Sequence, residues 1–365
     1  LVAECGFEIW DRLDGVVPDG AKKQPSHYNK HLGKLGYEGP NPWHQWANSA
    51  RGDDGEILSG WLLSHASEPA AVDEPDSETP YTTTRAIEFM EQAKDDSWCL
   101  HLSYIKPHWP YIVPAPYHDM YGPDDVLPVK RSEVEKTDPH PLLSGYYNHR
   151  YSKAFSRDDV RETVIPAYMG LITQIDDQIG RIVKYLEDSG QTDETLIVFT
   201  SDHGDYLGDH WLGEKELFHD QSSRVPLIIF DPSKAADETR GTVNPNLTEA
   251  IDLVPTFVDY MGGHIPDHIL EGHSLLPALH GDLTPKRSYA ISEYDYSARP
   301  HLRHLSPDAK SCGLTMVFDG HWKLIWVEGH RPMLYDLEID PEEYHDLGAS
   351  PAHQDQVQRL SRLLF

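Results

Sequence analysis

The sequence of 365 residues predicts an α/β fold, in which a mostly parallel sheet is sandwiched by helices and a small antiparallel subdomain follows. Three observations predict it. Apolar residues recur at helical spacing between 164 and 186, two short, almost continuously apolar runs follow at 195–200 and 225–230, and short strand candidates separated by turns begin after about residue 285. Runs of this kind are typical of strands that are buried on both faces, as in a parallel sheet covered by helices.

The first half of the chain contains fewer periodic segments. Thr79 and Pro80 have the residue types of a helix start, and Gly190 is placed to end the long helix. The other expectations are an exposed acidic loop at 67–78, a strand at 98–104 that two prolines terminate, and a polar surface excursion at 117–159.

The second half of the sequence predicts a helix over 247–261, followed by a series of short strands. The expected C-terminal elements are strands at 288–293, 314–318, 322–327 and 333–336, and a last helix at 354–364. We therefore divide the chain into a larger domain over 1–285 and a C-terminal antiparallel subdomain with its terminal helix over 286–365.

Composition excludes several classes of protein. Lys and Arg total 31 against 60 Asp and Glu, so the net charge of −29 disfavours nucleic acid and anionic membranes as partners. Cys5, Cys99 and Cys312 form no zinc or disulfide pattern, and no apolar run is long enough to span a bilayer. We expect a small anionic substrate, held by local positive charge, and leave a homo-oligomer open. A targeting signal could lie upstream of Leu1, and we place a cytoplasmic location ahead of a periplasmic or secreted one.

The most informative residues directly follow the first apolar run. Asp202 and His203 are expected at the carboxyl end of a strand, where open α/β sheets bind ligands. Their oxygen and nitrogen donors suit one divalent metal ion, which could be Mg, Ca, Mn or Zn. The alternative is a turn-capping Asp202 beside a surface His203. His210 and His219 lie nearby, and we expect them to be surface or hydrogen-bonded core residues rather than groups that support the site.

The run SDHGDYLGDHWLGEKELFHDQSSRVPLII resembles the second conserved block of the sulfatases and of the phosphonate monoester hydrolases, in the alkaline-phosphatase-like superfamily. The resemblance implies that Asp202 and His203 bind the metal and that Lys215 contacts sulfate or phosphate oxygens. IKPHWPYIVPAPY resembles the segment whose histidine hydrogen-bonds the bridging oxygen of the ester, which implies that role for His108. Lys106 would add positive charge for the substrate, or is a surface lysine at a strand end.

Similarity to the family extends from about residue 80 to the end of the chain. HWKLI and the LYDL stretch that follows it resemble the family's C-terminal subdomain. The opening residues Asp14–Pro18 and Asn41–His44 look more like the phosphonate monoester hydrolase branch.

The family's nucleophile is a formylglycine, made from the Cys or Ser of a Cys-x-Pro-x-Arg or Ser-x-Pro-x-Arg motif, and neither motif occurs here. A strand that ends in an Asp-Asp pair, which supplies further metal ligands, is also missing. We therefore expect an N-terminally truncated chain of a metal-dependent sulfate ester hydrolase, inactive by itself. The alternatives are a phosphonate monoester or phosphodiester hydrolase and a catalytically inactive binding protein with the same fold.

Overall fold

The structure, a computed structural model, describes residues 6–9, 11, 13, 25–266, 268–306, 308 and 311–365. Asp14–Pro18 and Cys5 lie outside the described residues. The chain forms two compact units, each with its own hydrophobic core. Unit 1 comprises residues 1–128 and 158–192, and unit 2 comprises residues 129–157 and 193–365. A domain boundary near residue 285 stays a prediction.

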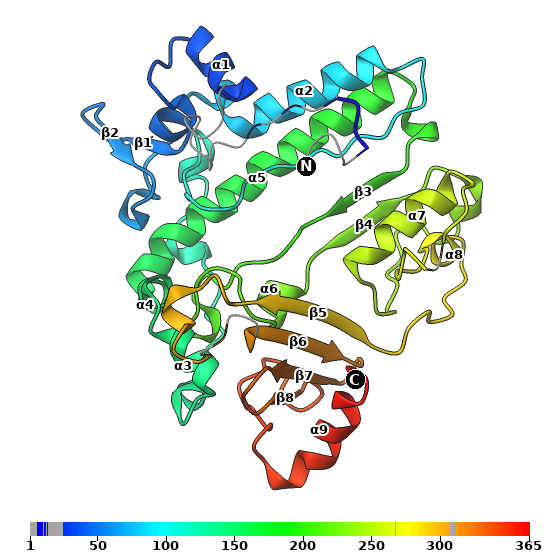
Figure 1. Cartoon of the computed structure of the whole chain (residues 1–365). Helices are drawn as coiled ribbons and strands as arrows, with labels where there is room; N and C mark the ends of the chain where they lie inside the picture. The colour runs from blue at the N-terminus through cyan, green and yellow to red at the C-terminus, as the bar shows by residue number, and fades with distance from the viewer. Residues whose placement is uncertain are drawn as a thin grey trace. The chain divides into compact units, whose positions relative to one another are not determined.

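Unit 1 is built around its longest helix. Its elements are α1 (His27–Lys34), the antiparallel strands β1 (Ser49–Arg51) and β2 (Ile57–Ser59), α2 (Glu78–Gln92) and α5 (Asp158–Asp188). Helix α2 packs along α5 (Figure 1). The long helix and its end are confirmed: Gly190 has a φ of +74°, and the Gln191 N–H donates to the Leu186 carbonyl at 2.8 Å.

Two expectations for unit 1 are wrong. The segment at 67–78 is not simply an exposed loop, because Ala70, Ala71 and Val72 are buried and Glu78 begins α2. Residues 98–104 form no strand. Their alternating pattern of apolar residues is not matched by a neighbouring strand, and a strand exists only where a partner supplies its hydrogen bonds.

Unit 2 contains the remaining elements. They are α3 (Pro141–Tyr147), α4 (Arg150–Phe155), β3 (Ile197–Thr200), α6 (Asp220–Ser223), β4 (Leu227–Phe230), α7 (Leu253–Tyr260), α8 (Leu276–Leu279), β5 (Ala290–Asp295), β6 (Gly313–Phe318), β7 (Trp322–Val327), β8 (Met333–Asp336) and α9 (Gln354–Ser361). The expected surface excursion is corrected, because α3 and α4 bury Leu142, Tyr146 and Phe155. None of the described helices has both the length and the apolar composition that crossing a bilayer requires.

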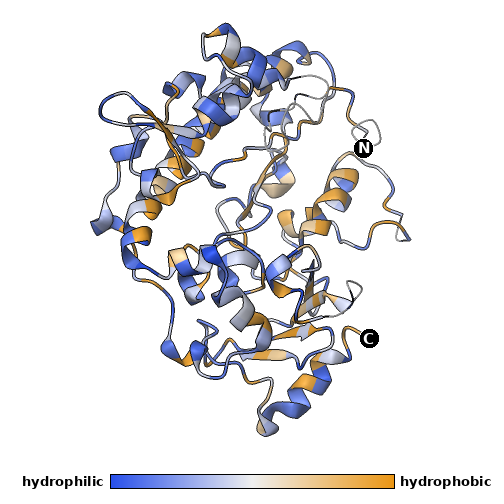
Figure 2. Cartoon of the chain, turned by 60° about the vertical axis from the view of Figure 1, so that its left-hand side comes forward, coloured by the Kyte–Doolittle hydropathy of each residue, from blue (hydrophilic) through white to orange (hydrophobic). Residues whose placement is uncertain are grey.

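The C-terminal subdomain is the antiparallel sheet that the sequence predicts. Its strand order is β5-β6-β7-β8, and α9 packs against it (Figure 1). Leu324 of β7 pairs with Val317 and Leu334 of the adjacent strands, and all three side chains are buried. These strands are largely hydrophobic (Figure 2).

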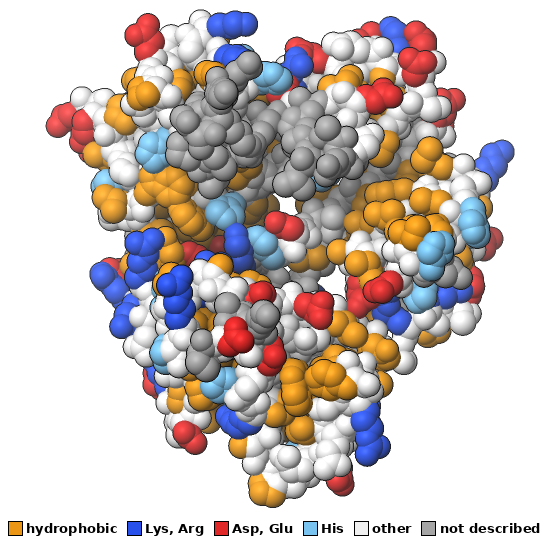
Figure 3. All heavy atoms as spheres, in the orientation of Figure 1, with side chains coloured by type: hydrophobic (Ala, Val, Ile, Leu, Met, Phe, Trp, Pro, Cys, Tyr) orange, Lys and Arg blue, Asp and Glu red, His pale blue; other side chains and the backbone are white. Residues whose placement is uncertain are grey.

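Strands β3 and β4 depart from the expected parallel sheet. The α/β class holds, but β3 pairs antiparallel with β4, and every strand pair among the described residues is antiparallel. Burial is also incomplete, because Phe199 is 38% exposed and Ile228 is 63% exposed. Hydrophobic side chains also gather at the surface over α7 (Figure 3).

Candidate active site

Asp202 and His203 lie in the loop that directly follows β3. The His203 Nδ1 atom is 2.8 Å from the Gly204 carbonyl oxygen, so this nitrogen carries the proton as a donor. The other ring nitrogen, Nε2, is 3.4 Å from Oδ2 of Asp202, whose side chain is 85% exposed. A backbone hydrogen bond of this kind is the usual way to fix the tautomer of a metal-binding histidine.

The geometry of this pair can be tested against a metal ion. Two ligands at about 2.1 Å from one ion, with a tetrahedral angle between them, are about 3.4 Å apart, and Oδ2 and Nε2 have this separation. Structural and catalytic sites normally take at least three protein ligands. Within the part of the chain that the structure describes, no group of three or more His, Cys, Asp or Glu side chains could hold a metal ion. The pair fits two positions of such a site and does not complete it.

Helix α6 joins this loop to Lys215. The Gly204 N–H donates to the Ser222 carbonyl at 2.8 Å, and the Ser222 hydroxyl donates to the Lys215 carbonyl. A Cβ atom at residue 204 would lie 1.9 Å from the Gln221 carbonyl oxygen, so the approach requires glycine. Three of the five predicted site residues therefore belong to one hydrogen-bonded region of unit 2.

Two carboxylates flank Lys215. Glu214 and Glu216 are both buried, and burial together with the charge of Glu216 raises the pKa of Glu214 to about 7. Glu216 pairs with Arg299. Among the described residues, none accepts a hydrogen bond from the Lys215 ammonium or forms an ion pair with it, so this charge remains available for an anion.

His108 and Lys106 lie in unit 1, on the proline-rich segment after residue 104. The His108 Nδ1 atom is 2.7 Å from the Trp109 carbonyl oxygen, which makes Nε2 the nitrogen that can exchange a proton. Lys106 is only 5% exposed, so it is not a surface lysine. Its Nζ is 2.7 Å from the Pro110 carbonyl oxygen, 3.0 Å from Asn48 Oδ1 and 3.6 Å from Glu78 Oε1. These internal contacts account for the charge without a substrate.

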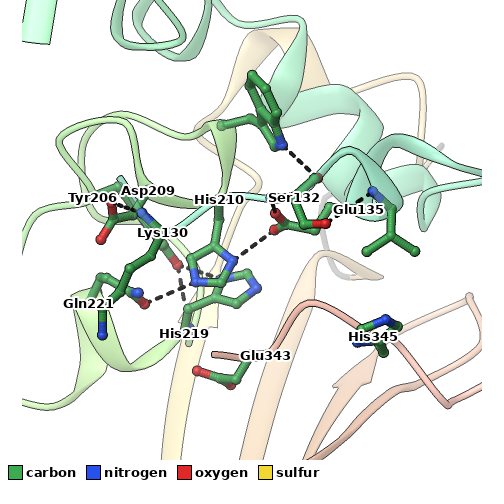
Figure 4. A network of polar contacts seen from close by, with 12 residues as sticks. Lys130, Ser132, Glu135, Tyr206, Asp209, His210, His219, Gln221, Glu343 and His345 are labelled. Atoms are coloured by element: carbon green, nitrogen blue, oxygen red, sulfur yellow. Dashed lines mark hydrogen bonds and ion pairs between the residues drawn. The ribbon is translucent and has the colours of Figure 1, made fainter. Parts of the chain in front are cut away.

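His210 and His219 are buried core residues whose rings stack at 4.1 Å between centroids (Figure 4). His210 Nδ1 is 2.8 Å from Glu135 Oε1, and its Nε2 is 3.1 Å from Gln221 Oε1. His219 Nδ1 is 2.9 Å from the Tyr206 hydroxyl. Burial, with the charges of His210 and Lys323, holds the pKa of His219 well below its usual value, so this ring is neutral. The sequence left a surface position and a hydrogen-bonded core position open for these two histidines, and both are hydrogen-bonded core residues.

Comparison with known proteins now decides the family. The model of the sulfatase family matches residues 41–263, more than half of the chain. The chain belongs to the sulfatase family. A second model, of the C-terminal region of N-sulphoglucosamine sulphohydrolase, matches residues 208–365.

Relatives of this sulfatase-family chain have several activities in their names. A multifunctional alkaline phosphatase superfamily protein of Trinickia caryophylli is 33% identical over 78% of the chain, and the match covers 59% of that protein. An arylsulfatase of Clostridium perfringens is 27% identical over 99% of the chain and is covered over 71%. The structure of the phosphonate monoester hydrolase of Silicibacter pomeroyi matches 93% of the chain at 30% identity with a TM-score of 0.81, and 68% of that protein is covered. The chain thus spans about six to seven tenths of the length of these relatives.

Sequence reasoning did not single out three charged residues that meet at the first residue of α6. They are Asp220, Lys323 and Glu343, which are far apart in the sequence of this sulfatase-family chain. A signal was present, because Lys323 interrupts the otherwise apolar strand β7, and a lysine is almost never fully buried unless it is paired. The sequence could not identify the partners, which lie about 20 and 100 residues away.

Proposed function

We propose that this chain is part of a metal-dependent hydrolase of sulfate esters. Membership of the sulfatase family supports the sulfate ester as substrate class. The single observation that carries the proposal is the arrangement around α6. It joins a carboxylate–imidazole pair at metal-ligand separation to a lysine whose ammonium is not held by a described side chain.

Each residue has a distinct task in this proposal. Asp202 and His203 would hold the divalent ion, which supplies charge neutralisation for the ester oxygens when bound. Lys215 would contact the oxygens of the anion, where negative charge develops during hydrolysis. His108 would donate its Nε2 proton to the leaving oxygen, a role that rests on the resemblance alone. We do not retain substrate binding by Lys106 as part of the proposal.

The nucleophile and the remaining metal ligands have no counterpart in the sequence. No Cys or Ser here precedes x-Pro-x-Arg, and the relatives are longer than the chain. We therefore propose that formylglycine is supplied by a segment upstream of Leu1, and that the 365 residues alone do not turn over substrate. The substrate would be a small anionic ester.

A phosphonate monoester or phosphodiester is the second candidate substrate. The likeness to the phosphonate monoester hydrolase of Silicibacter pomeroyi, with its TM-score of 0.81, favours it specifically. An inactive binding protein is disfavoured by the joint presence of His108, Asp202, His203 and Lys215, since only chemistry requires that set.

The experiment compares the 365-residue chain with a longer protein translated from the upstream reading frame. Both are assayed on p-nitrophenyl sulfate and p-nitrophenyl phenylphosphonate. We expect no turnover by the chain, and turnover by the longer protein that a chelator abolishes and added divalent metal restores. In the longer protein, Asp202→Asn and Lys215→Met should each lower kcat/KM for the better substrate at least about a hundredfold.

The ratio of kcat/KM for the two substrates separates the candidate functions. Faster sulfate hydrolysis supports a sulfatase, and faster phosphonate hydrolysis supports the phosphonate monoester hydrolase. Turnover by the 365-residue chain contradicts the incomplete site. An upstream frame without a Cys- or Ser-x-Pro-x-Arg motif favours the binding protein.

A further inference from the structure

Lys323 is a lysine inside a hydrophobic strand. It lies on β7 of the C-terminal sheet and is 2% exposed. Its Nζ is 2.8 Å from Asp220 Oδ1, 2.8 Å from Glu343 Oε1 and 3.0 Å from the Phe218 carbonyl oxygen. The ammonium donates hydrogen bonds to Phe218 and Asp220, and it forms an ion pair with the buried carboxylate of Glu343.

All three partners of the Lys323 ammonium lie at the start of α6 or contact it. Phe218 immediately precedes this helix, and Asp220 is its first residue. Glu343 reaches the same point by a second route, because its Oε2 accepts a hydrogen bond from the Asp220 N–H at 2.9 Å. Lys323 and Glu343 thus fix both the side chain and the backbone of Asp220.

Ser222, in the same helix, contacts both segments of the predicted site. Ser222 accepts from the Gly204 N–H, next to His203, and its hydroxyl donates to the Lys215 carbonyl. Gln221, the residue between Asp220 and Ser222, contacts His210, whose Nε2 lies 3.1 Å from Gln221 Oε1 (Figure 4). A displacement of α6 would therefore move both site segments together.

We propose that Lys323 is a positioning residue, which holds α6 and thereby sets the positions of Lys215 and of the Asp202–His203 loop. This inference rests on the proposed function for the importance of those residues. It gives the C-terminal subdomain a role in the site although none of its residues is predicted to touch substrate. It also explains why a charge is kept in β7, since an apolar residue would satisfy the sheet but not Asp220 and Glu343.

The test uses three variants of the 365-residue chain. Lys323→Met removes the charge, and Lys323→Arg keeps it. Lys130→Met is the matched control, because Lys130 forms an exposed ion pair with Glu342, beside Glu343, at 2.9 Å. Hydrogen exchange is followed in peptides covering 202–206, 215–224 and β5, and the affinity for inorganic sulfate is titrated.

In Lys323→Met we expect exchange at least about tenfold faster in 202–206 and 215–224, with β5 unchanged. Sulfate affinity should fall at least about fivefold, as a consequence of a misplaced Lys215. Lys323→Arg should restore most of both properties, and Lys130→Met should resemble the wild type.

Equal acceleration in all three peptides, or none in 215–224, would overturn the positioning role. A generally unfolded Lys323→Met variant leaves Lys323→Arg to decide, since wild-type exchange but impaired sulfate affinity in that variant also contradicts the proposal. If the wild type does not bind sulfate, or if Lys215→Met does not weaken binding, the proposed function is contradicted. The hydrogen-exchange rates still test whether Lys323 positions α6.

Discussion

His140 is buried as a neutral side chain with both ring nitrogens engaged. Nδ1 accepts a hydrogen bond from the Leu142 N–H at 3.1 Å, at the start of α3, and Nε2 lies 2.9 Å from the Arg331 carbonyl oxygen. Protonation of Nδ1 would turn the acceptor into a donor that faces another donor. Burial lowers the pKa of His140 to about 4. The unfolded chain therefore binds this proton at a higher pH than the folded chain, and stability falls as the pH drops below about 6.5.

We predict that acidification from pH 7 to pH 4 costs on the order of 3 kcal/mol of unfolding free energy through His140. His140→Asn keeps a side-chain acceptor at the helix start but does not titrate there, so its loss of stability over this range should be smaller by that amount. Urea unfolding at both pH values measures the difference. Identical pH dependence in the two proteins would show that His140 is not the titrating group.

Lys106 and Glu78 form a buried charged pair in unit 1, and Glu78 also accepts a hydrogen bond from Trp43 Nε1 at 2.8 Å. Lys106→Met should lower the free energy of unfolding by about 3 kcal/mol, because it leaves the Glu78 charge buried without its cation. Urea unfolding followed by tryptophan fluorescence measures this loss.

A second change should relieve the same cost. Adding Glu78→Gln to Lys106→Met removes the orphaned charge and should recover part of the stability. Lys94→Met, in an exposed pair with Glu91, is the control and should change nothing measurable. If Lys106→Met leaves stability intact, the internal contacts do not explain this lysine, and substrate binding becomes the better account.

At the scale of elements, two glycines near the end of α5 have opposite conformational roles. Gly180 lies within the helix, and a Cβ atom there meets open space. Gly190 has a φ of +74° in the turn that ends it. Gly180→Ala should raise the unfolding free energy by about 0.5–1 kcal/mol, and Gly190→Ala should lower it by about 1 kcal/mol. Chemical denaturation of both variants in parallel checks the pair, and a shift of the same sign in both would contradict these roles.

The same helix illustrates what a sequence can predict. Local periodicity and a terminal glycine identify α5 and its end because both are properties of a few adjacent turns. Pairing of β3 with β4 is not local, since apolar composition indicates burial and a strand but not the direction of its neighbour. The prediction of a strand at 98–104 was wrong for the same reason, because its apolar pattern does not show whether a partner strand is present. The candidate site divides similarly: a continuous motif predicts Asp202, His203 and Lys215, whereas the contacts of Lys323 depend on how distant segments meet.

For the whole molecule, the exposed apolar surface of β3 and β4 opposes the solubility that a net charge of −29 favours. Exposed strands with apolar faces template association with other chains. We predict concentration-dependent self-association, reduced by Ile228→Thr and measured by sedimentation velocity. Val243→Thr, at a more exposed apolar position (88% exposed) outside the strands, is the control. A similar effect of both variants would assign the association to apolar residues in general.

The two buried lysines have a practical consequence for protein chemistry. Lys106 belongs to unit 1 and Lys323 to unit 2, and both amines are nearly inaccessible to solvent. An acylating reagent should modify exposed amines such as that of Lys184 within the first moments and reach these two only when their surroundings open. Mass spectrometry of a labelling time course would then measure the opening of unit 1 through Lys106 and of unit 2 through Lys323. The order in which the two amines react would show which unit opens first.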